Sequence, residues 1–169
     1  GQMFVLQYGS RFCFTAVLDG DNTTALNYYT AEYAPDGLVG GVILGLKMMH
    51  MGRSTIEPWE ETGDATDPYR RSLSQEMPIG LRARDSVKIV DGSMYWVDQH
   101  NQPRRTGNAV IPDNFMGADV AMALEATDPD DIIGFALEFA GHAMYGLRLP
   151  TMCALYDANY DEAIRFKTN

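Results

Sequence analysis

Apolar side chains fill almost every position of the segment 132–147, in which Glu138 and His142 are the strongly polar residues. The sequence before this segment is typical of a helix start, because Asp128 can cap and Pro129 suits the first helical position. Pro150 prevents continuation beyond it. An apolar surface on all sides is typical of a buried helix. We therefore predict a buried helix over residues 129–147 as the centre of the core.

Residues 87–97 instead alternate between apolar and polar positions around Asp91-Gly92. Asp-Gly between two alternating runs is typical of a hairpin with a two-residue turn. The turn sets the register of the pairing, and the hydrophobic pattern favours the same register. In it, Val87, Ile89, Met94 and Trp96 share one face, and Lys88 and Tyr95 share the other.

The remaining elements are expected from shorter signals. Residues 4–6 and 12–18 are rich in aromatic and β-branched residues, which favours two strands, with a helix as the alternative. A helix is expected from Asn22 or Thr23, and a buried helix, with a strand as the alternative, over residues 38–51. Further predictions are a short strand at 109–111, a helix at 117–126 and a terminal helix opened by a capping box at 159–162.

These elements predict an α+β fold in a single domain, residues 1–169. Its sheet would be an antiparallel meander over about 84–111, joined by the N-terminal strands and packed against helix 129–147 and shorter helices. Between them, residues 52–80 carry three prolines and many acidic residues, which predicts a long polar loop. Gly1 and Gln2, which precede Met3, are interpreted as an artificial addition.

The chain has 169 residues, of which 46% are hydrophobic and 21% charged, and its formal net charge is −10. The negative charge disfavours nucleic acid and anionic membranes as partners and favours a protein with a basic surface. Neither a signal peptide nor an apolar run of about 20 residues is present, so we expect a cytoplasmic protein. Cys13 and Cys153 are expected to be buried thiols, with one long-range disulfide as the alternative.

The sequence Asp19-Gly20-Asp21-Asn22-Thr23 follows an apolar run and resembles the first motif of the haloacid-dehalogenase phosphatases. The resemblance implies that Asp19 is a nucleophile, that Asp21 is a general acid/base, and that both bind Mg²⁺. It covers these five residues and the preceding strand. The later motifs of that family and its alternating βαβ units are not found, and the same residue types are common in tight turns.

Glu138 and His142 would lie one turn apart on the predicted helix, as an acid/base pair or as a polar stripe. Neither this pair nor His50, within a methionine-rich stretch, has the ligand spacing of a metal site. We therefore predict no metal and no cofactor, with Mg²⁺ at Asp19 and Asp21 as the alternative.

The function that best fits these observations is that of a small acidic interaction protein, not an enzyme, that binds and possibly inhibits a basic protein partner. Immunity-type inhibitors and accessory proteins of mobile elements have this profile. The polar segment 52–80 would supply the binding surface, with Trp59 as an apolar anchor inside a charged rim. The residues expected to bind are Glu57, Trp59, Glu60, Glu61, Asp64 and Asp67. The alternative is Mg²⁺-dependent phosphoryl transfer by Asp19 and Asp21.

Overall fold

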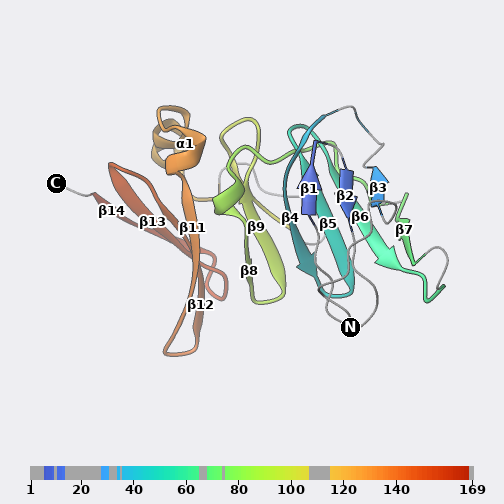
Figure 1. Ribbon diagram of the computed structural model, residues 1–169. Helices are drawn as coiled ribbons and strands as arrows, with labels where there is room; N and C mark the ends of the chain where they lie inside the picture. Colours follow the sequence, from blue (N-terminus) through green and yellow to red (C-terminus); the bar gives the residue numbers. More distant parts are fainter. Residues whose placement is uncertain are drawn as a thin grey trace. The chain divides into compact units, whose positions relative to one another are not determined.

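The computed structural model describes residues 6–9, 11–13, 28–30, 34, 36–64, 68–73, 75–106 and 115–167. The chain forms two compact units, Gly1–Gly80 and Leu81–Asn169, which we describe separately. Antiparallel strands are the main regular structure in the described part of each unit (Figure 1). The fold is therefore mostly β, and the predicted α+β class is wrong.

The first unit contains two sheets of consecutive antiparallel strands. The first sheet consists of β1 (Leu6–Tyr8), β2 (Arg11–Cys13) and β3 (Tyr28–Thr30). The second consists of β4 (Leu38–Leu44), β5 (Lys47–Gly52), β6 (Ile56–Glu61) and β7 (Tyr69–Arg71). Each sheet is thus a meander, in which neighbours in sequence are neighbours in space.

The predicted N-terminal pair of strands agrees with β1 and β2 over residues 6–8 and 11–13, and the rest of the predicted strand 12–18 lies outside the described residues. Of the two helices predicted in this unit, the one over 38–51 is wrong, and most of the one starting at Asn22 or Thr23 lies outside the described residues. Tyr29, expected on the helix that starts at Asn22 or Thr23, lies in strand β3. Residues 38–51 form the hairpin β4–β5, so their strand alternative is correct. Gly45 provides the turn of this hairpin with a φ of +61°, which an L side chain rarely adopts. Residues 52–80, predicted to be a loop, contain β6 and β7.

The central strands of the β4–β7 sheet, β5 and β6, are largely buried on both faces, whereas Ile43 of β4 is 58% exposed. Met48 and Trp59 are paired on one face, where the Tyr29 ring lies 5.1 Å from the Trp59 ring. Met49 and Met51 lie on the other face, 4% and 0% exposed. The sequence of a strand that is covered on both faces is a nearly continuous apolar run. The alternation of apolar and polar residues that a half-exposed strand shows is therefore missing here.

The described part of the second unit contains two further meanders and one α-helix. The three-stranded sheet consists of β8 (Lys88–Val90), β9 (Ser93–Val97) and β10 (Pro103–Arg105). The four-stranded sheet consists of β11 (Ile133–Phe139), β12 (His142–Arg148), β13 (Met152–Asp157) and β14 (Glu162–Lys167). Helix α1 (Ala118–Glu125) and two 3-10 turns, η1 (Arg84–Ser86) and η2 (Pro129–Asp131), complete the unit.

The central helix predicted over residues 129–147 is wrong, because this segment forms the hairpin β11–β12. The start signal at Asp128 is real but local: its carboxylate accepts a hydrogen bond from the Asp130 amide and caps only η2. The chain then reverses at Ala140 and Gly141, whose φ angles are 51° and 83°. The predicted terminal helix is also wrong, since strand β14 occupies that region.

Two predictions in this unit are confirmed. The hairpin β8–β9 turns at Asp91-Gly92, with positive φ at both residues, and pairs Ile89 with Met94 and Lys88 with Tyr95 as expected. Helix α1 lies within the predicted range 117–126 and buries Val120 and Leu124. None of the helices in the described residues has the length and apolar content needed to span a membrane. The strand predicted at 109–111 lies outside the described residues.

The two sheets of the second unit pack face to face through aromatic rings. Tyr95 of β9 stacks on Tyr145 of β12, with ring centroids 5.0 Å apart, and lies 6.1 Å from Tyr156 of β13. The Tyr145 hydroxyl donates a hydrogen bond to the carbonyl of Ser86, in η1, over 2.8 Å. This burial raises the pKa of Tyr145 far above its usual range. These ring contacts and this hydrogen bond connect the two sheets and η1 within the second unit.

Candidate functional site

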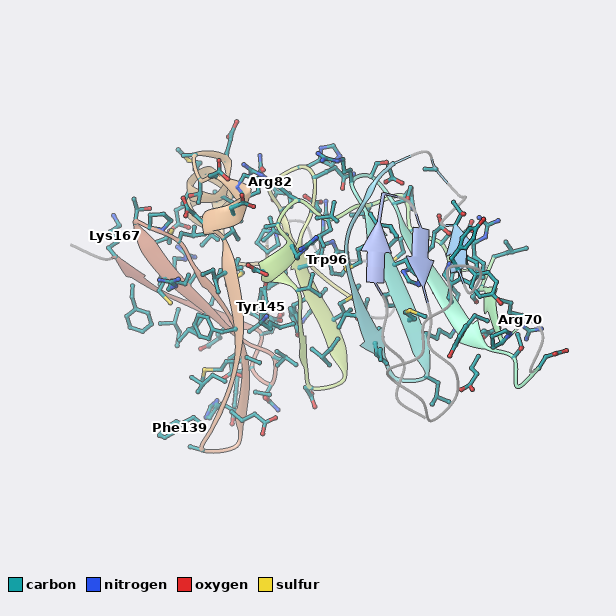
Figure 2. The ribbon with its side chains drawn as sticks, in the orientation of Figure 1. Arg70, Arg82, Trp96, Phe139, Tyr145 and Lys167 are labelled. Carbon is teal, nitrogen blue, oxygen red and sulfur yellow. The ribbon has the colours of Figure 1, made fainter. Side chains whose placement is uncertain are left out.

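A pocket of about 370 Å³ lies in the second unit, where turns of three hairpins meet. The turns are those between β8 and β9, between β11 and β12, and between β13 and β14. Figure 2 labels Phe139 at the tip of the β11–β12 hairpin. The pocket is lined by Asp91, Glu138, Phe139, Ala140, Gly141, His142, Ala143 and Asn159.

Two of the turns are tight and present their side chains to solvent. Ala140 and Gly141 both have positive φ, so the β11–β12 turn needs only these two residues, as the Asp91-Gly92 turn does. Phe139, directly before the turn, is 71% exposed. The Phe139 ring is therefore available at the surface of this hairpin tip.

Hydrogen bonds connect the β11–β12 turn to the β13–β14 turn. The Ala143 amide donates to the Asn159 side-chain oxygen over 2.8 Å, and the Ala158 amide donates to the Ala143 carbonyl over 2.8 Å. One backbone–backbone bond and one bond to the Asn159 side chain therefore join the two turns at the wall of the pocket.

His142 is held by a buried carboxylate. Its Nδ1 lies 2.5 Å from Asp157 Oδ2, and the Tyr160 ring stacks on the imidazole at 4.9 Å. Burial raises the pKa of Asp157, but hydrogen bonds from His142 and from the amides of Asn159 and Tyr160 outweigh this effect and lower the pKa below its usual value. Asp157 is thus an anion that orients the imidazole.

The pocket lining brings together two carboxylates, Asp91 and Glu138, and one imidazole, His142. Asp91 and Glu138 are exposed, and neither carboxylate has an ion-pair partner within the described part of the chain. The lining contains neither a serine nor a cysteine that His142 could activate as a nucleophile. In the ranges that the structure describes, no three His, Cys, Asp or Glu side chains converge as metal ligands.

The structure places the predicted pair Glu138 and His142 at the same pocket, but not on one face of a helix. In the hairpin, Glu138 pairs with Ala143 and Phe139 pairs with His142, so the two side chains start on opposite faces of the sheet. The sequence reasoning missed Asp157 as the partner of His142. No spacing rule connects the two, because β12 and β13 bring them together only after the chain has reversed.

The residues predicted to bind a partner lie in the first unit and do not form one exposed surface. Glu57 and Trp59 are 2% and 8% exposed, and Glu60 forms an ion pair with Arg70 over 3.2 Å. Glu61 and Asp64 are exposed, and Asp67 lies outside the described residues.

The residues of the phosphatase alternative, Asp19 and Asp21, also lie outside the described residues. All described strand pairs are antiparallel, whereas that resemblance implies parallel βαβ units. Of the two cysteines, Cys153 is a free thiol in the structure.

Comparison with known proteins gives one result for nearly the whole chain. Residues 1–165 match the family described as "Bacteriophage P22 Gp10, beta-propeller". No curated protein matches the chain. The successive antiparallel meanders observed here agree with this description, because a propeller blade is a four-stranded antiparallel sheet.

Proposed function

Because the chain belongs to the family described as Bacteriophage P22 Gp10, beta-propeller, we propose that it is an acidic, non-enzymatic interaction protein that binds a basic protein partner. Propellers hold their turns on a rigid array of sheets, and turns so held are frequent sites of binding. The negative net charge of −10 would attract a basic partner and speed the encounter.

The observation that carries this proposal is the pocket formed by the hairpin turns of the second unit. It combines two carboxylates that form no ion pair in the described chain, Asp91 and Glu138, with the exposed ring of Phe139. An arginine or lysine side chain of the partner would fit this combination. A cation contacting an aromatic ring contributes about 0.5–2 kcal/mol, and a carboxylate about 4 Å away contributes further through Coulomb attraction.

The experiment is a pull-down with the full chain at low and high salt, followed by affinity measurements with the recovered partner. The variant Asp91→Asn/Glu138→Gln removes two charges from the pocket. The matched control, Glu125→Gln/Asp130→Asn, removes two exposed carboxylates outside it, so both variants have the same net charge.

We expect the pocket variant to bind at least about tenfold more weakly, equivalent to about 1.4 kcal/mol, and the control to bind nearly as well as the wild type. Binding should weaken as salt rises, because exposed charges are screened. Equal affinities for the two variants, or binding that salt leaves unchanged, would exclude the pocket as the basic partner's site.

No described feature favours the phosphatase alternative, so we base no second proposal on it.

A further inference from the structure

The turn between β5 and β6 binds a carboxylate of the chain itself. We call residues Gly52, Arg53, Ser54 and Thr55 the β5–β6 turn. The Oδ2 atom of Asp36 accepts hydrogen bonds from the Ser54 amide over 2.6 Å, from the Ser54 hydroxyl over 2.9 Å and from the Thr55 amide over 2.9 Å. The Thr55 hydroxyl donates to Oδ1 over 3.1 Å. Two amides and two hydroxyls of one turn thus converge on a single carboxylate.

Contacts other than those of Asp36 also hold this turn in place. The Gly52 amide donates to the Thr55 carbonyl over 2.8 Å, which closes the turn. Gly80 packs against the turn backbone so closely that a Cβ at this position would overlap the Arg53 carbonyl group. Gly52 leaves room for the ligand, because a Cβ there would lie 2.5 Å from Asp36 Oδ2. Amides that converge in a fixed concavity are typical of anion-binding sites.

The β5–β6 turn offers an anion more than Asp36 uses. Arg53 is exposed and forms no ion pair, with Asp36 or with any other carboxylate, within the described part of the chain. Ser54 is exposed as well, so its donors can be reached from solvent. A guanidinium on the same turn as amide and hydroxyl donors favours the binding of carboxylate and phosphate groups. The local charge of this turn is therefore opposite to the net charge of −10 of the chain.

We propose that the β5–β6 turn is an oxyanion-binding site and that Asp36 is its tethered occupant. Its ligand is a carboxylate or phosphate group, which presents the same negatively charged oxygens to the donors. An external oxyanion competes with Asp36 for Ser54 and Thr55. Asp36 lies two residues before β4, so its displacement releases the entry to this strand from the turn. This site lies in the first unit and does not depend on the pocket of the second.

The test removes the tethered occupant and supplies oxyanions from solution. Asp36→Ala is prepared as the full chain, and sodium phosphate, sodium acetate and sodium chloride are added at equal ionic strength. Binding is followed by the amide resonances of Ser54 and Thr55 and by the melting temperature. The matched control is Asp128→Ala, which removes a carboxylate that caps η2. The triple variant Asp36→Ala/Ser54→Ala/Thr55→Val lacks both hydroxyl donors of the site.

We expect phosphate and acetate to shift both amide resonances of Asp36→Ala saturably and to raise its melting temperature by about 2 °C or more, because each binds the folded chain. Chloride should do neither. The triple variant should bind at least about tenfold more weakly, and the wild type should need at least about tenfold more oxyanion, because Asp36 competes. Asp36→Asn weakens the occupant without removing it and is measured in the same way, in case Asp36→Ala does not fold.

The outcomes separate an oxyanion site from a carboxylate that only caps a turn. Equal responses of Asp36→Ala to phosphate, acetate and chloride would overturn the proposal. An equal gain in the melting temperature of Asp128→Ala would overturn it too, because the oxyanions would then act without the site. Tighter binding of phosphate than of acetate would assign the site to phosphate groups, and the reverse order would assign it to carboxylates.

Discussion

The buried histidine of the first unit predicts a specific loss of stability in mild acid. His50 is 0% exposed, and burial lowers its pKa from 6.5 to about 3. Glu57 lies directly opposite it in the sheet, and the Arg71 guanidinium lies 3.9 Å from that carboxylate. In the folded chain the imidazole therefore stays neutral between pH 7 and pH 5.

The sign and size of the effect follow from proton binding. Below pH 6.5 the unfolded chain binds a proton at this histidine and the folded chain does not, so stability falls as the pH falls. pH 5 lies about 1.5 units below the ordinary pKa of a histidine side chain, so protonation stabilises the unfolded state by about 2 kcal/mol at this pH. Because the pKa of His50 falls from 6.5 to about 3 on folding, the total loss of unfolding free energy from this histidine is limited to about 5 kcal/mol, and it is complete only below about pH 3.

The assay is urea unfolding at pH 7 and pH 5, followed by the fluorescence of Trp59, whose ring centroid lies 6.2 Å from that of His50. Trp96→Phe removes the signal of the second unit. His50→Gln cannot titrate, and its loss of unfolding free energy between the two pH values should be about 2 kcal/mol smaller than that of the parent. His100→Gln, at an exposed turn residue, should behave as the parent does. Equal losses in the parent and in His50→Gln would refute the reasoning.

Three further substitutions test how the second unit is held together, each by the midpoint of chemical or thermal unfolding. Asp98→Ala should lower the free energy of unfolding by about 3–5 kcal/mol. The Asp98 carboxylate is 0% exposed and accepts a hydrogen bond from Arg104 over 2.6 Å, so its removal would leave the Arg104 cation nearly buried without this carboxylate. A decrease below about 1 kcal/mol would contradict this. Gly134→Ala should lower the free energy of unfolding by about 1–3 kcal/mol, because the new Cβ would lie 2.3 Å from the Ser86 carbonyl oxygen. An unchanged unfolding midpoint would show that the backbone moves aside at this position. Ala140→Asn should stabilise by about 0.5–1 kcal/mol, because asparagine tolerates the φ of 51° better than alanine, and a lower midpoint would argue against strain in this turn.

The sequence specified the turns of this protein better than it specified the elements between them. Asp91-Gly92 predicted a hairpin with the correct register, because a two-residue turn and an alternating pattern give the same pairing. For segment 129–147 the sequence predicts a helix, and for segment 38–51 a helix with a strand as the alternative, because apolar residues fill both faces of their strands and no alternation is visible. For such runs the period cannot separate a buried strand from a buried helix. The glycines were the available signal: Gly45 and Gly141 mark the reversals.

The same limit explains why the site could be predicted only in part. Glu138 and His142 could be singled out as polar residues in an apolar segment, but their neighbours could not. Asp91 reaches the pocket from another hairpin, and Asp157, which contacts His142, lies on β13. Local sequence determines that each hairpin turns, whereas the face-to-face packing of the two sheets determines which turns meet. That packing depends on Tyr95 and Tyr145, which no local pattern connects. In a fold of stacked meanders, the residues that share a pocket on the turns are therefore decided by contacts between sheets, which the sequence of a single chain does not reveal.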